Sequence, residues 1–81
     1  MELGPDCTLL HGVTLQNSQR TRIGRGVVLA NGVTVLAGSR IGEGSLIGAA
    51  SVVRGEIPPA SVAVGAPARV VRATRPGEAA T

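Results

Sequence analysis

The 81-residue sequence predicts an all-β chain wound into a three-sided coil of short strands. Three observations predict this fold: an aliphatic residue recurs at every sixth position, 12 residues are glycine, and no residue is aromatic. A period of six scatters its members around an α-helix, and glycine at this density disfavours helix. Short strands joined by tight corners, three to a coil, instead place every sixth side chain inside.

The repeat runs through most of the chain. From Ile23, each step of six reaches an aliphatic residue as far as Val53, and three leucines precede this series with the same spacing. We therefore expect about three coils over residues 3–57, stacked about 4.8 Å apart. Residues eighteen apart should then lie over one another, in three columns: Leu3, Ile23 and Ile41; Leu9, Leu29 and Ile47; Leu15, Val35 and Val53.

Two further features complete the pattern. The step from Leu15 to Ile23 is eight residues, so residues 16–22 are expected to form a loop insertion, and columns crossing it are spaced by twenty. The fifth position of each six-residue unit should also face inward. These positions are occupied by Cys7, Val13, Val27, Val33, Ser39, Ser45, Ser51 and Ile57.

Charge and composition limit the class of function. The eight cations are all arginine, and the formal net charge is +3. They do not form a cluster interleaved with aromatic residues, so we expect no nucleic-acid partner. Arginine does suit a small phosphorylated ligand. The single cysteine and the absence of a membrane-length apolar run favour a cytoplasmic protein with no membrane partner.

Two stretches, "IGEGSLIGAASVV" (41–53) and "IPPASVAVGAPARVV" (57–71), resemble the hexapeptide-repeat transferases. The ending "VGAPARV" narrows the resemblance to acetyltransferases, and "LLHGVTL" (9–15) is similar to the carboxy-terminal part of serine acetyltransferase, with sugar O-acetyltransferases second. The resemblance implies a left-handed parallel β-helix and a homotrimer. It also implies a capping segment at 58–72, after which we expect a disordered tail at 73–81.

The resemblance further implies transfer of an acetyl group from acetyl-coenzyme A, a co-substrate, to a hydroxyl of a small acceptor such as serine or a sugar. His11 is the third residue of its unit, and the same slot in the next two coils holds Asn31 and Ala49. In the family the pantetheine arm follows such a column, which implies cofactor contacts at Asn31, Gly48 and Ala49. His11 is then the candidate general base.

Arg54 and Arg69 are the candidate ligands for the phosphates of coenzyme A, because guanidinium binds phosphate through paired hydrogen bonds. Alternatives stay open for the role of His11 and for the function of the chain. A corner histidine is also compatible with plain solvation, and alignment with serine acetyltransferases matches His11 to a position that they do not use as a base. The alternative function is a catalytically inert or truncated hexapeptide-repeat module that acts as a trimeric scaffold. No metal site is expected, since a zinc carbonic anhydrase needs three histidines.

Overall fold

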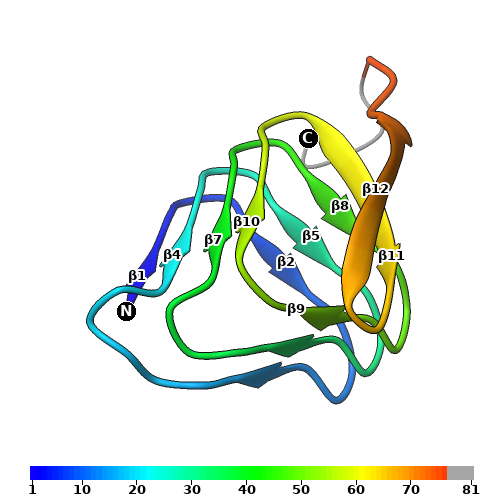
Figure 1. Ribbon diagram of the computed structural model, residues 1–81. Helices are drawn as coiled ribbons and strands as arrows, with labels where there is room; N and C mark the ends of the chain where they lie inside the picture. The colour runs from blue at the N-terminus through cyan, green and yellow to red at the C-terminus, as the bar shows by residue number, and fades with distance from the viewer. Residues whose placement is uncertain (77–81) are drawn as a thin grey trace.

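The computed structural model describes residues 1–76, which form twelve strands and no helix, wound as a three-sided solenoid (Figure 1). Sheet A contains β1 (Glu2–Leu3), β4 (Arg22–Ile23), β7 (Arg40–Ile41) and β10 (Glu56–Ile57). Sheet B contains β2 (Thr8–Leu9), β5 (Val28–Leu29), β8 (Leu46–Ile47), β11 (Ser61–Gly65) and β12 (Ala68–Ala73). Sheet C contains β3 (Thr14–Leu15), β6 (Thr34–Val35) and β9 (Val52–Val53). No helix in residues 1–76 is long and apolar enough to span a membrane.

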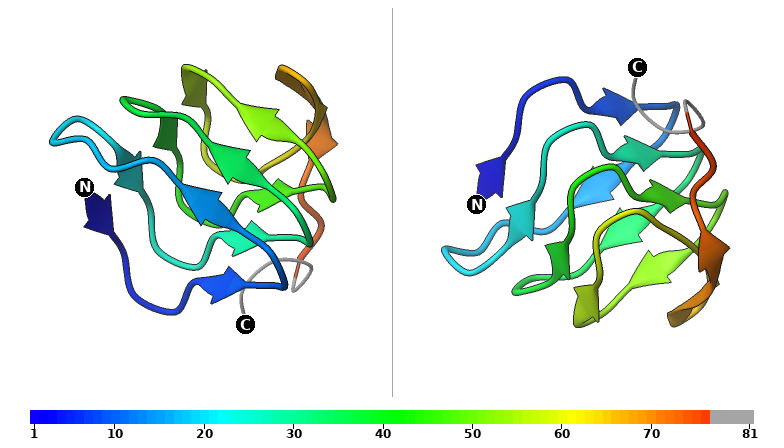
Figure 2. Two further views of the ribbon diagram at one scale, coloured as in Figure 1. Left: turned by 90° about the horizontal axis from the view of Figure 1, so that it is seen from below. Right: turned by 90° about the horizontal axis from the view of Figure 1, so that it is seen from above.

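The predicted columns are confirmed by the register of the parallel sheets. Leu3 pairs with Ile23 across the loop insertion, and Ile23 pairs with Ile41 eighteen residues later. The other two columns follow the same rule. The views along the vertical axis show the coils stacked layer on layer (Figure 2). The period of six therefore predicts which residues are neighbours in space as well as the fold class.

Burial is less uniform than the period predicts. Leu29, Ile47, Val35 and Val53 are fully buried, whereas Leu3 and Leu9 are 47% and 41% exposed. The expectation that all nine leading residues are buried is therefore wrong for the first coil. Its side chains are covered by a neighbouring coil on one side only, and for the same reason Cys7 is half-buried rather than fully enclosed.

The predicted three coils are present, and two further strands, β10 and β11, stack on the last of them. Ile57 was expected in a fifth position, but it pairs with Ile41 as the leading residue of a further strand. The corner before β10 is two residues shorter than the corner before β7, because Val53 precedes Ile57 by four residues and Val35 precedes Ile41 by six. Ala63 then pairs with Ile47, so β10 and β11 form part of a fourth coil.

The chain ends in an antiparallel hairpin of β11 and β12. The second strand continues through Ala73, and the Thr74 N–H donates to the Ala60 carbonyl at 2.9 Å. Ordered structure therefore extends past the predicted start of the tail at residue 73. The remainder of that prediction, residues 77–81, lies outside the described residues.

Buried hydroxyls hold this last, irregular coil in place. Ser45 donates to the Pro58 carbonyl at 2.9 Å and accepts from the Ser61 N–H at 3.2 Å. Ser51 accepts from the Gly65 N–H at 3.0 Å. One coil earlier, where the ladder is regular, the equivalent positions are valines. Serine replaces valine where main-chain groups need a side-chain partner, because a buried polar group without one is costly.

The loop insertion is attached to the coil above it. Thr21 is fully buried, and its hydroxyl accepts from the Gly38 N–H at 2.8 Å. The side-chain oxygen of Gln16 accepts from the Ala37 N–H at 3.2 Å. The insertion spans residues between β3 and β4 and ends at Arg22, where the strand resumes. Two side chains therefore align the strands on either side of the insertion.

Candidate functional site

The predicted column of His11, Asn31 and Ala49 lies at the corner where sheet B turns into sheet C. The Gly32 N–H donates to the His11 carbonyl at 2.9 Å, and the Ala50 N–H donates to the Asn31 carbonyl at 2.8 Å. These bonds stack the three corners directly, so the placement inferred from the spacing is confirmed. We call this set of three corners the B–C corner.

The tight turn at the B–C corner depends on a left-handed residue in each coil. Gly12, Gly32 and Ala50 have φ of 74°, 72° and 60°. A Cβ on Gly12 or Gly32 would meet only atoms 3.8 Å away or more, so space is available there. Glycine is used at this corner for its backbone conformation, which costs other residues free energy.

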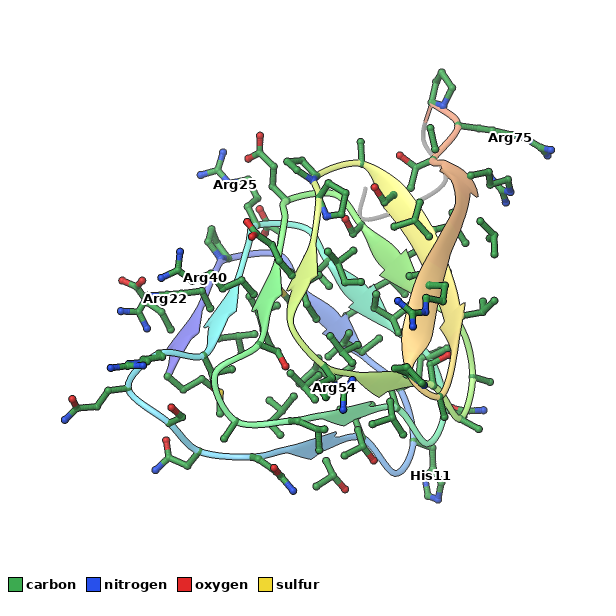
Figure 3. All side chains as sticks on the ribbon, in the orientation of Figure 1. His11, Arg22, Arg25, Arg40, Arg54 and Arg75 are labelled. Carbon is green, nitrogen blue, oxygen red and sulfur yellow. The ribbon has the colours of Figure 1, made fainter. Side chains whose placement is uncertain are left out.

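His11 is exposed, and its imidazole points away from the solenoid at the B–C corner (Figure 3). Within residues 1–76 the imidazole has no hydrogen bond to another group, but its main chain is held firmly. The His11 N–H donates to the Asn31 Oδ1 at 3.0 Å. The Asn31 side chain therefore holds the main chain of the predicted base, while the cofactor contact predicted at Asn31 is to its backbone.

At position 48, glycine is required by packing rather than by backbone conformation. A Cβ at this position would lie 2.5 Å from Cγ1 of Val64, which covers Gly48 from the next coil. Val64 pairs with Arg69 across the hairpin, so Arg69 lies in a strand beside the B–C corner. Three predicted cofactor residues and one cation thus share one end of sheet B.

Arg54 does not belong to this group. It follows β9, at the end of sheet C that is remote from the B–C corner along the strand. It is exposed. The structure thus brings His11, Asn31, Gly48 and Ala49 together with Arg69 nearby, and it separates Arg54 from them.

Four of the remaining charged residues lie on sheet A. Glu2, Arg22, Arg40 and Glu56 occupy successive rungs of its outer face, and Arg22 Nε lies 3.0 Å from Glu2 Oε1. Arg22 and Arg40 lie side by side in Figure 3. The twenty-residue spacing across the insertion makes Glu2 the neighbour of Arg22 and so accounts for this ion pair.

Two surface grooves lie beside these charges rather than at the B–C corner. One has a volume of about 350 Å³ and is lined by Arg25, Gly26, Glu43, Gly44, Pro59 and Ala60. The other, of about 480 Å³, runs over Gly4, Gly24 and Gly42 on sheet A. At the B–C corner, His11, Asn31 and Ala49 are all exposed, so the predicted site lies open at the surface of a single chain.

The repeat that builds this solenoid is matched by a known protein family. The bacterial transferase hexapeptide family (six repeats) matches residues 20–55. The solenoid of six-residue units defines the chain as a hexapeptide-repeat protein. It belongs to the hexapeptide-repeat acetyltransferases.

Particular relatives support this assignment. Serine acetyltransferase of Mycobacterium tuberculosis is 40% identical over 93% of this chain. A maltose O-acetyltransferase from Clostridium difficile superposes with a TM-score of 0.82 at 31% identity over 91% of the chain. A hexapeptide-repeat acetyltransferase from Vibrio cholerae, solved with acetyl-coenzyme A, gives 0.66 at 26% identity over 89%.

The matches cover only part of each relative. The chain spans 35% of the serine acetyltransferase, 48% of the maltose O-acetyltransferase chain and 45% of the Vibrio cholerae chain. The shared part is the repeat-bearing part, and it includes the B–C corner.

Proposed function

We propose that this chain is an acetyl-coenzyme A-dependent O-acetyltransferase, which transfers an acetyl group to a hydroxyl of a small acceptor, serine or a sugar. The observation that supports it is the stacked column of His11, Asn31 and Ala49. A relative with the same fold is solved with acetyl-coenzyme A. In this proposal the pantetheine arm lies along the B–C corner, past Gly48 and Ala49, and its thioester reaches the coil that carries His11.

The proposed chemistry is general-base catalysis. A hydroxyl is a weak nucleophile at neutral pH, and a neutral imidazole within hydrogen-bond distance takes its proton as the oxygen attacks the thioester carbon. The carbon–oxygen bond forms, the carbon–sulfur bond breaks, and the proton passes from His11 to the departing sulfur. Arg69, beside this corner, is the proposed phosphate ligand, and Arg54 is a second candidate at a more remote position.

The proposed active unit is a homotrimer. Within residues 1–76, four large exposed hydrophobic residues lie in sheet B or directly follow one of its strands without belonging to an inward column: Leu10, Val64, Val70 and Val71. Sheet A carries charges instead, and exposed apolar surface marks association sites. A partner against sheet B would supply the wall that the B–C corner lacks on a single chain. The expected mass by light scattering is three times 8.1 kDa, and a monomer at millimolar concentration would contradict this assembly.

Activity is tested by release of free thiol from acetyl-coenzyme A with serine or maltose as acceptor. His11→Ala is expected to lower kcat/KM by about 10²–10⁴-fold, the usual contribution of a positioned base. Asn17→Ala, an exposed change in the loop insertion, is the matched control and should leave the rate unchanged. Failure of the wild-type chain to bind coenzyme A at millimolar concentration would overturn the proposal.

A second candidate is an inert trimeric module. The specific observation in its favour is the exposed imidazole of His11, which no described side chain orients. This candidate predicts that the chain binds coenzyme A or forms trimers while thiol release stays at the uncatalysed rate. The same assay therefore separates the two.

A further inference from the structure

We propose that Asn31 both positions His11 and donates a hydrogen bond to the reacting thioester, an inference that rests on the function proposed above. Its side-chain oxygen accepts from the His11 N–H at 3.0 Å. Its side-chain amide group remains for the substrate. Asn31 is then a catalytic residue, in addition to lying on the predicted path of the pantetheine arm.

The hydrogen bond to His11 settles which way the Asn31 amide faces. The main-chain N–H of His11 is a donor, so the atom opposite it must be the oxygen of the amide. The nitrogen, Nδ2, is therefore on the other branch of the planar group, with two N–H donors. Within residues 1–76, Nδ2 donates to no protein acceptor.

The hydrogen bond between the His11 N–H and Asn31 Oδ1 also restrains the corner at His11 more than the corner at Asn31, one coil higher. Both polar main-chain groups of His11 have partners in the coil above, Asn31 Oδ1 and the Gly32 N–H. At the equivalent place one coil higher, Asn31 stacks under Ala49, whose methyl group cannot accept a hydrogen bond. The additional restraint falls on the one corner that carries an imidazole.

The position of Nδ2 suits a specific step. Asn31 and His11 lie one coil apart, about 4.8 Å along the column. A thioester reaching His11 from Ala49 passes Asn31 first. As the acceptor oxygen bonds to the thioester carbon, the carbonyl electron pair moves onto oxygen, and an N–H of Nδ2 stabilises the negative charge. That pair returns when the carbon–sulfur bond breaks, and the sulfur takes the proton from His11.

Two substitutions separate the two tasks. Asn31→Asp keeps an acceptor for the His11 N–H but, when ionised, has no donor; Asn31→Ala lacks both. We expect kcat for thiol release to fall about 10²-fold or more in each variant, the usual effect of removing one such donor. KM for acetyl-coenzyme A should change less than threefold. Protection of the His11 amide from hydrogen exchange should persist in Asn31→Asp and disappear in Asn31→Ala.

Asn17→Asp is the matched control, since it adds the same charge in the exposed loop and should leave kcat within about twofold. Wild-type kcat in Asn31→Asp would overturn the donor role, and unchanged amide protection in Asn31→Ala would overturn the positioning role. An inactive wild-type chain marks failure of the proposed function itself. The donor role of Asn31 then fails as well, because there is no reaction for it to assist. Hydrogen exchange of the His11 amide still tests the positioning role.

Discussion

Gly42→Ala is expected to destabilise the solenoid by more than about 3 kcal/mol, at the upper end of overpacking effects. A Cβ at this position would lie 2.3 Å from the nitrogen and 2.6 Å from the Cα of Pro59 in the next coil. These are main-chain atoms, so relief requires the coils to move apart and to lose ladder hydrogen bonds. Urea unfolding at fixed protein concentration measures the change.

Gly32→Ala is the matched control because its difficulty is conformational rather than steric. Its φ is 72°, but an added Cβ would meet nothing closer than 3.8 Å. Ala50 adopts φ of 60° at the same corner one coil higher. The expected cost is about 1–2 kcal/mol, the left-handed penalty alone. Equal losses in the two variants would show that coil spacing is not the constraint at Gly42.

Leu29→Ala is expected to lower the free energy of unfolding by about 2–5 kcal/mol, as usual for a leucine deleted from a closed core. Leu29 is fully buried between Leu9 below and Ile47 above. Coils on both sides are tied by main-chain ladders, so the surroundings cannot collapse into the space. Urea denaturation measures this loss. If the slope of the unfolding free energy against urea concentration is unchanged, the loss is one of stability alone.

Leu9→Ala removes the same atoms from the same column, where the side chain is 41% exposed. We expect less than half of the loss found for Leu29→Ala, because less apolar surface returns to water and no closed cavity forms. A larger loss for Leu9→Ala would mean that the first coil is covered in solution, for instance by a partner chain.

The sequence predicts some of the features on which these predictions depend, whereas others are visible only in the structure. The columns follow directly from the period, since parallel strands of constant length place each leading residue over the previous one. Ile57 was misplaced because it fits the period of six as a fifth-position residue, while the shortened corner before β10 makes it a leading residue. Only the paired strands distinguish these two assignments.

The candidate site shows the same division. Spacing alone placed His11, Asn31 and Ala49 in one column. It did not reveal that Asn31 Oδ1 accepts from the His11 N–H, because that bond depends on a side-chain rotamer chosen when two coils stack. Arg54 and Arg69 were equivalent in the sequence, and the turn of β12 back along β11 placed only Arg69 beside the corner.

By itself, the sequence determined the repeating unit, the inward residues of the middle coils, the interruption after Leu15 and the edge that carries His11. These are local properties, because each six-residue unit repeats the same strand and corner. Only the tertiary structure decided how the solenoid ends, with Leu3 and Leu9 of the first coil exposed and a hairpin on the last coil. It also decided which side chains bond across coils. Those outcomes depend on whether another layer lies above or below a residue, and a periodic pattern carries no information about its own boundaries.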